Sequence, residues 1–331
     1  MQARSARWPR RPPHQGEVTG LAGRKGSSSL DRVGAKLYRT LMADTATAAI
    51  PIISSLKELG PRYRVWLVDI WGVMHNGHRA YLRSLISTRA FREEGGIVVL
   101  LSNSPRPSAA VQQQMRDLGI PYDAYDATVT SGDLTRYELA KHQGARVFHL
   151  GPGRDQPIFD GVDVRLVGRD DAELIVCSGL FDDETETPDN YQSMLKAFAD
   201  RRLPMICANP DIQVERGPKL IWCAGALAAL YEKLGGKVVW AGKPYAPIYR
   251  LAFETVTGLA GGNVPKEQIL AIGDGINTDI KGAAGAGIDA VFVVSGLHLP
   301  DAPPGAPLDG AKLAPLFSGK RPIAAMRALA W

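Results

Sequence analysis

The sequence predicts an α/β protein built on a doubly wound parallel sheet, with helices on both of its faces. From residue 50 onward, short runs of aliphatic and β-branched residues alternate with amphipathic stretches of helical period. Most of these apolar runs have no polar residue at alternate positions, which is typical of parallel strands covered on both faces. An order of this kind joins neighbouring parallel strands through right-handed crossovers.

The apolar runs are predicted to be strands and the amphipathic stretches between them to be helices. The expected strands, in chain order, lie at residues 65–70, 96–104, 145–151, 172–180, 203–210, 237–244, 268–275 and 289–296. The expected helices are Tyr81–Glu94, Ser108–Leu118, Thr187–Arg201, Gly225–Leu234 and Tyr245–Thr257. Residues 127–134 are expected to complete the core, and the proline-rich residues 299–307 to form an exposed loop.

The net charge of +5 over 331 residues comes from the N-terminal end of the chain. Residues 1–41 hold nine Lys or Arg and two acids, or +7, whereas the rest holds 30 basic and 32 acidic side chains, or −2. The basic composition therefore does not indicate a nucleic-acid-binding face, and we expect no nucleic-acid partner. Residues 1–45 are expected to be disordered, or to precede a true start at Met42. A transit peptide is the alternative, although three prolines interrupt any helix there.

The cysteines and the hydropathy place the chain among ordinary globular proteins. Cys177, Cys207 and Cys223 are widely spaced among apolar neighbours, so we expect reduced, buried thiols and no metal site built from them. No apolar run approaches the roughly 18 residues that a membrane span needs. The sequence therefore predicts a cytoplasmic protein with no membrane partner.

Polar side chains stand at the ends of four of the expected strands: Asp69, Ser102 with Asn103, Lys243 and Asp274. Ligands of an open parallel sheet bind at the carboxyl ends of its strands. If these four ends meet in one crevice, they bring a carboxylate, a hydroxyl, an ammonium and a second carboxylate around one small volume.

Each strand end suggests a part of one site. Asp274, in the glycine-rich segment GDGINTD, suits a hard cation such as Mg²⁺, whereas Asp279 could equally cap the following helix. Ser102, ahead of a predicted helix start, would help to cradle a phosphate, and a simple turn is the alternative. Lys243 would hold the phosphate beside a nucleophile and neutralise clustered acids.

The segments DIWGVMHNG, LLSNSPRP, AGKPY and GDGINTDIKGAAGAG, in this order, resemble the haloacid dehalogenase superfamily of hydrolases. The resemblance is closest to the class IIA branch of NagD-like and para-nitrophenylphosphatase-like proteins, and it covers about residues 50 to 331. It implies a Rossmann-like core, residues 46–139 plus 238–331, with an inserted α/β cap of the C2 type near residues 140–237. Caps of this class commonly join dimer interfaces, so a homodimer is one expected assembly.

Carried over by position, the resemblance implies an Mg²⁺-dependent phosphatase of a small phosphorylated metabolite. Asp69 would attack phosphorus to give an aspartyl-phosphate, and Ser102 and Lys243 would hold the phosphoryl oxygens. Mg²⁺ would bind the carboxylates of Asp69 and Asp274 and the backbone carbonyl of Trp71. Asp279 would support Lys243 or the metal.

Substrate-binding residues are expected at Asn103 in the core and in the cap. The cap candidates share positions in predicted loops and are Gly151, Gly153, Asp182, Asp183, Asn209 and Asp211. Each of the cap residues could equally be an ordinary turn or loop residue without a role in binding.

The chain departs from the family at Trp71. Phosphatases of this family have a second Asp at this position, which protonates the leaving oxygen and then activates water. An indole N–H cannot exchange a proton near neutral pH, so an intact nucleophile and metal site are predicted without their acid–base catalyst. His75 and His78 follow closely and could lend a proton, but solvated loop histidines are the expected reading.

Three functions follow from this departure. The first is weak phosphoester hydrolysis, which makes the chain an enzyme. The second is a catalytically impaired protein that binds Mg²⁺ and a phosphorylated ligand, or regulates through it. The third is carbon–halogen hydrolysis, because haloacid dehalogenases also have Asp followed two positions later by an aromatic residue and need no Mg²⁺.

Overall fold

The computed structural model describes residues 48–216, 219–294, 306–319 and 321–331. The predictions made for residues 1–45, and those for most of the proline-rich segment 299–307, lie outside these residues. In the part of the chain that is described, no helix combines the length and the apolar character needed to cross a membrane.

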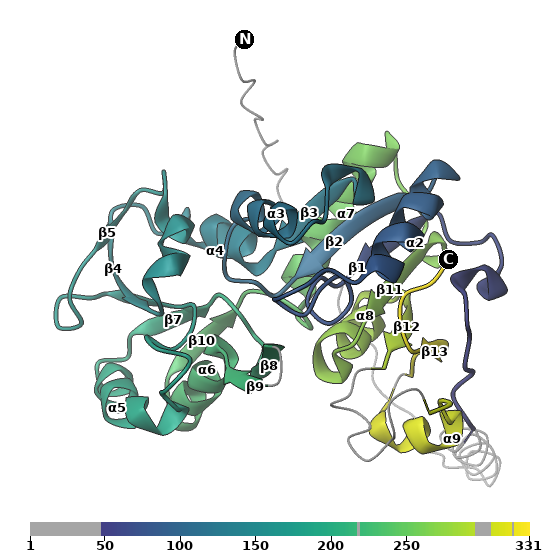
Figure 1. Cartoon of the computed structure of the whole chain (residues 1–331). Helices are drawn as coiled ribbons and strands as arrows, with labels where there is room; N and C mark the ends of the chain where they lie inside the picture. The colour runs from purple at the N-terminus through teal and green to yellow at the C-terminus, as the bar shows by residue number, and fades with distance from the viewer. Residues whose placement is uncertain (1–47, 217–218, 295–305, 320) are drawn as a thin grey trace, which may run out of the picture. The chain divides into compact units, whose positions relative to one another are not determined.

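A six-stranded parallel sheet forms the core, in the order β13-β12-β11-β1-β2-β3 (Figure 1). The strands are β1 (Val65–Val68), β2 (Ile97–Ser102), β3 (Ala127–Thr130), β11 (Ile269–Gly273), β12 (Asp289–Val293) and β13 (Ala324–Met326). All five pairings in this sheet are parallel, so the doubly wound parallel fold expected from the sequence is confirmed. The register pairs Val68 of β1 with Ile272 of β11, which aligns the ends of these strands.

Alternate residues of β1 enter two different apolar clusters, one on each face of the sheet. Trp66 and Val68 pack in a cluster with residues of α2 (Leu82–Glu93) and α3 (Ser108–Asp117). Val65 and Leu67 pack in a second cluster with residues of α4, α7 and α8. These helices span Ser131–Leu139, Ala246–Ala260 and Lys281–Ala286. Both faces are therefore covered, which explains why the strands are apolar throughout.

A second sheet is inserted in the chain between β3 and β11. Its order is β10-β7-β6-β4-β5, and all its pairings are parallel. The strands are β4 (Ala145–Leu150), β5 (Val164–Leu166), β6 (Leu174–Cys177), β7 (Pro204–Cys207) and β10 (Lys237–Trp240). Helices α5 (Gln192–Asp200) and α6 (Ala224–Lys233) pack on it through an apolar cluster that includes all three strands β4, β6 and β7. The strands fall close to the range predicted for the cap, and the boundaries at 140 and 237 stay a prediction.

The structure corrects the sequence-based assignment of one strand. Residues 237–240 were expected to end in the same sheet as Asp69, but β10 pairs with β7 in the second sheet. Lys243 therefore follows a strand of the inserted sheet, not a strand of the core. Apolar strands of both sheets have the same sequence pattern, so the pattern could not assign this strand to one of them.

Other differences are local. The helix predicted at Thr187–Arg201 is divided into a 3₁₀ turn, Pro188–Tyr191, and α5. The antiparallel hairpin of β8 (Gln213–Arg216) and β9 (Lys219–Trp222) was not predicted. The three cysteines are free and buried, as expected.

Candidate active site

Asp69 is the residue that directly follows β1, and its side chain is buried with a relative exposure of 7%. Its backbone N–H donates to the carbonyl of Ile272 at 2.8 Å, which continues the pairing of β1 with β11 by one residue. Asp274 follows the end of β11 in the same way. Two adjacent parallel strands thus deliver two carboxylates to one edge of the sheet, as the sequence predicts.

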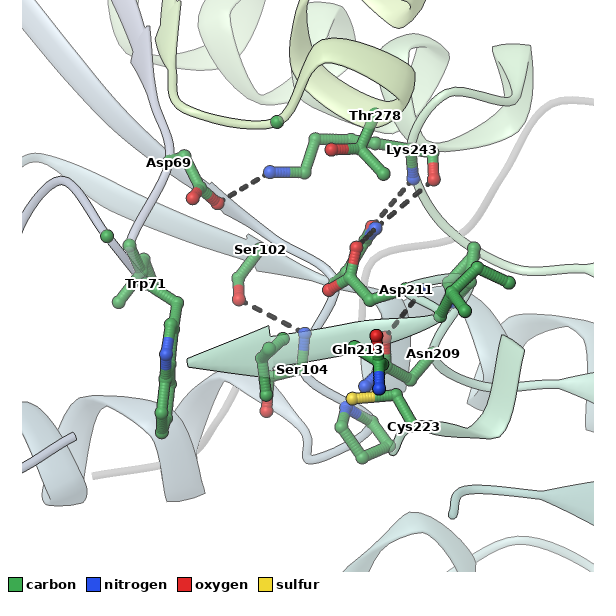
Figure 2. A pocket seen from close by; sticks show the side chains of 18 of the residues that line it. Asp69, Trp71, Ser102, Ser104, Asn209, Asp211, Gln213, Cys223, Lys243 and Thr278 are labelled. Carbon is green, nitrogen blue, oxygen red and sulfur yellow. Dashed lines mark hydrogen bonds and ion pairs between the residues drawn. The ribbon is translucent and has the colours of Figure 1, made fainter. Parts of the chain in front are cut away.

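Lys243 reaches this edge from the loop after β10. Its buried ammonium donates to Asp69 Oδ1 at 2.5 Å (Figure 2). It also donates to Asp279 Oδ1 at 2.8 Å. A third hydrogen bond goes to the carbonyl of Leu101 at 3.0 Å, at the end of β2. All three protons of the ammonium thus have an acceptor, so Lys243 links the ends of β1 and β2 with the π-helical turn Ile276–Ile280 that follows β11.

Negative charge exceeds positive charge at this edge of the sheet. Carboxylate oxygens of Asp69, Asp274 and Asp279 lie within 4.8 Å of one another, and one ammonium stands among them. Burial raises the pKa of the Asp69 carboxyl above its ordinary value, and the ammonium of Lys243 only partly opposes it. Burial and the carboxylate of Asp69 raise the pKa of Asp274 as well. Burial alone would lower the pKa of Lys243, but its acidic neighbours raise it.

This donor set fits a divalent cation. Clustered carboxylates with a deficit of positive charge are the oxygen ligands that Mg²⁺ binds. Asp279 contributes less, because Lys243 uses its Oδ1 and the N–H of Gly275 donates to its Oδ2 at 3.1 Å. Gly72, in the loop after Asp69, packs directly against Asp274: its φ is +84°, and a Cβ there would lie 2.2 Å from Asp274 Oδ2.

Ser102 and Asn103 occupy the end of β2, and both side chains are buried. The hydroxyl of Ser102 accepts a hydrogen bond from the N–H of Ser104 at 3.1 Å, which tightens the loop after the strand. The Asn103 side chain accepts from the N–H of Lys243 at 2.7 Å and donates to its carbonyl at 3.1 Å. Asn103 therefore fixes the backbone from which the lysine side chain extends.

Two of the predicted cap residues, Asn209 and Asp211, lie next to Asn103. Asn103 Nδ2 donates to Asp211 Oδ1 at 2.9 Å, and Asn209 accepts from the N–H of Asp211 at 3.0 Å. Burial raises the pKa of Asp211, although Lys243 and Asn103 oppose the shift. Asn209 and Asp211 are thus joined to the core site through Asn103 (Figure 2).

Trp71 lines the same cavity as Asp69. Its six-membered ring covers Gly77, where a Cβ would fall 2.7 Å from Trp71 Cη2. Its ring also meets the ring of His75 edge-on, with centroids 5.1 Å apart. The indole thus has a packing role in the loop that follows Asp69.

The structure corrects the expectation of two solvated histidines. His78 is exposed, but His75 is buried with a relative exposure of 1%. Its Nδ1 accepts a hydrogen bond from the N–H of Gly77 at 3.0 Å. Burial, followed by the charge of Arg106, lowers the pKa of His75 to about 4, so the imidazole is neutral near pH 7.

A cavity of about 690 Å³ opens beside these groups and is lined by both sheets' loops. Asp183 lines it, whereas Gly151, Gly153 and Asp182 do not. Three arginines that were not predicted also line it: Arg106, Arg154 and Arg216. Arg106 stands in the segment SNSPRP, only four residues after Ser102, and this short spacing was the one available signal.

Comparison with known proteins assigns the family. A profile described as haloacid dehalogenase-like hydrolase matches residues 66–165, and a second, described as HAD-hydrolase-like, matches residues 240–315. The crystal structure of a hydrolase of the haloacid dehalogenase-like family from Brucella suis is 46% identical, with a TM-score of 0.75. The alignment covers 84% of this chain and 100% of that one. The chain belongs to the haloacid dehalogenase-like hydrolases.

More distant relatives of this hydrolase include named phosphatases. The ribonucleotide monophosphatase NagD of Escherichia coli K12 is 26% identical over 238 residues, 70% of this chain and 87% of NagD. The 5′-nucleotidase YutF of Bacillus subtilis is 23% identical over 239 residues, 71% of this chain and 88% of YutF. These matches support the class IIA branch and a phosphatase-like function.

Proposed function

We propose that this hydrolase cleaves small phosphate monoesters with the help of Mg²⁺, through an aspartyl-phosphate on Asp69. The observation that carries the proposal is the contact of the Lys243 ammonium with Asp69 at 2.5 Å, beside the carboxylates of Asp274 and Asp279. A buried nucleophile, a buried cation and a cation-binding carboxylate set around one point are what phosphoryl transfer requires.

Each residue has a separate role in this scheme. The Asp69 carboxylate forms the bond to phosphorus while the ester oxygen leaves. Lys243 and the hydroxyl of Ser102 hold the phosphoryl oxygens, and Asn103 keeps the lysine backbone in place. Asp69, Asp274 and the carbonyl of Trp71 would hold Mg²⁺, which supplies positive charge for the phosphoryl oxygens when bound.

Turnover should be slow with poor leaving groups. Trp71 cannot donate a proton to the leaving oxygen, and general acid–base help is worth roughly 10²–10⁴ in rate. An aryl oxygen leaves without a proton, but an alkyl oxygen does not. We therefore expect measurable hydrolysis of para-nitrophenyl phosphate and much slower hydrolysis of alkyl phosphates.

The test is a Mg²⁺-dependent assay of wild type and Asp69→Asn with para-nitrophenyl phosphate. Turnover by the wild type that is lost by at least about 10³-fold in the variant supports an attack by Asp69. Turnover that survives in Asp69→Asn contradicts the proposed nucleophile.

Trp71 favours a second candidate, a protein that binds Mg²⁺ and a phosphorylated ligand without turning it over. Phosphate binding by a wild type that shows no turnover would support this role. Chloride release from a 2-haloacid, with the halogen on the carbon next to the carboxylate, in the absence of metal would instead support the dehalogenase. The carboxylate cluster around Lys243 makes this third function the least favoured one.

A further inference from the structure

Three arginines line the cavity: Arg106, Arg154 and Arg216. Arg154 is paired with Asp183, and Arg216 contacts Asp183 at 2.8 Å and Glu184 at 3.1 Å. The two cap arginines thus share the half-buried carboxylate of Asp183, and Arg216 also pairs with the exposed carboxylate of Glu184.

Arg106 differs from these two arginines. Its side chain is half-buried and lines the cavity, and it makes no ion pair shorter than 4.0 Å with any residue of the described ranges. Its guanidinium donates one hydrogen bond, to the amide oxygen of Gln114. Burying a guanidinium that makes no ion pair is unfavourable, and burial lowers the pKa of Arg106 although the carboxylate of Asp155 opposes the shift. An anion from the cavity would remove this cost.

The backbone of Arg106 is held firmly, so the arginine is presented at a fixed place. The N–H of Gly132 donates to the carbonyl of Ser104 at 3.1 Å. A Cβ at Gly132 would lie 2.4 Å from the backbone of Pro105 and Arg106, so the start of α4 packs directly on this loop. The same loop begins with the hydrogen bond between Ser102 and Ser104. Arg106 and the predicted phosphate-binding Ser102 are therefore parts of one rigid turn.

Arg106 and Asp69 both line the cavity, but different charged groups act on them. The charged groups that act on Arg106 most are Asp155, Arg154 and Arg216, all from the inserted segment. The charged groups that act on Asp69 are Lys243, Asp279 and Asp211. The side chain of Arg106 and the nucleophile thus stand in two different electrostatic environments within one cavity.

We propose that the ligand of this cavity has a second anionic group, a carboxylate or a second phosphate, which Arg106 binds with Arg154 and Arg216 close by. This inference rests on the proposed function, because it takes the phosphoryl group of the same ligand to lie at Asp69 and Lys243. An arginine binds either oxyanion through charge-assisted hydrogen bonds. The expected ligand is therefore a short phosphate ester with an acid at its other end.

Binding of phosphonates tests this without any need for turnover, because their carbon–phosphorus bond is not hydrolysed. Isothermal titration calorimetry, with Mg²⁺ present, would compare phosphonopropionate with hydroxypropylphosphonate, and phosphonobutyrate with hydroxybutylphosphonate. Propane bisphosphonate, compared with hydroxypropylphosphonate, tests whether the second anionic group can be a phosphate. We expect wild type to bind the doubly anionic member of at least one set roughly tenfold or more tightly than its hydroxyl analogue.

Arg106→Gln should reduce the ratio of the two affinities to about one, and Arg106→Lys should keep part of the preference. Arg169→Gln, at an exposed arginine outside the cavity, should bind as wild type does. Equal affinity of wild type for both members of every set, or a preference that survives in Arg106→Gln, would overturn the inference. An equal loss of affinity for both members would also overturn it, since Arg106 would then hold the phosphoryl group. None of these results depends on turnover, so they are separate from the Asp69→Asn assay.

Discussion

At the scale of single residues, Trp71 sets the expected rate of this hydrolase. The indole packs on Gly77 and against His75, at the position where the family resemblance implies an acid–base carboxylate. The neighbouring His75 is buried and neutral, so it is no ready proton donor for a leaving group at neutral pH. The loop is thus shaped by packing at the position where catalysis would need an acid.

Trp71→Asp should raise the turnover of an alkyl phosphate by about 10²-fold or more, because it supplies a group that can donate and accept a proton. The hydrolysis of para-nitrophenyl phosphate should rise less, since its leaving group needs no proton and only the later activation of water, which both substrates share, is improved. Steady-state kinetics with both substrates measures the difference.

The matched control is Trp71→Asn, which removes the indole but cannot exchange a proton. If Asn raises the alkyl phosphate rate as much as Asp does, relief of crowding explains the gain and the acid–base argument fails. A thermal melt of both variants checks that the loop has kept its fold.

At the scale of elements, Asn103 joins the end of β2 to the loop after β10. Its side chain makes hydrogen bonds to the N–H and the carbonyl of Lys243 and to Asp211. One amide thus connects a core strand with two segments that leave the inserted sheet. The position of Lys243 beside Asp69 depends on this connection.

Asn103→Ala should lower the free energy of unfolding by about 2 kcal/mol or more, because buried partners of the amide are left without hydrogen bonds. Turnover of para-nitrophenyl phosphate should fall in parallel, since Lys243 loses its backbone support. Urea unfolding and the phosphatase assay measure the two effects. Asn263→Ala, at an exposed asparagine, is the control and should change stability by no more than about 0.5 kcal/mol.

At the scale of the whole molecule, the buried carboxylates couple stability to pH and to metal. Burial raises the pKa of Asp69 from 3.8 to about 7, with Lys243 opposing the shift. Between these two values the folded protein holds a proton that the unfolded chain has lost. The metal-free protein should therefore lose this part of its stability as the pH rises through that window.

Mg²⁺ should reverse this trend. The cation competes with protons for the carboxylates, so its apparent affinity should rise with pH by about tenfold per unit for each proton displaced, until the pH exceeds the pKa. Mg²⁺ should thus raise the melting temperature clearly at pH 8 and little at pH 5.5, and EDTA should cancel the gain.

Asp274→Asn provides the control for metal binding, because it removes one of the proposed ligands. Its melting temperature should not respond to Mg²⁺ at either pH. A response equal to that of wild type would mean that the cation binds elsewhere. A wild-type response that is larger at pH 5.5 would contradict the direction of the pKa shift.

The sequence by itself determined what depends on neighbouring residues. Apolar runs without alternation fixed the parallel sheet, and Asp69 and Asp274 were found because each directly follows such a run. The predicted loss of an acid at Trp71 came instead from the resemblance to the family's motif. To predict a strand and the site residue that follows it, the local sequence pattern and the geometry of a parallel sheet are sufficient.

Only the tertiary structure decided which sheet holds β10, and hence that Lys243 enters the site from the inserted sheet. It also decided that His75 is buried and that Arg106 lines the cavity without an ion pair in the part of the chain that is described. These properties depend on contacts between residues far apart in the chain. An apolar strand has the same sequence pattern in either sheet, and an arginine after a turn has the same sequence pattern whether it meets water or an anion.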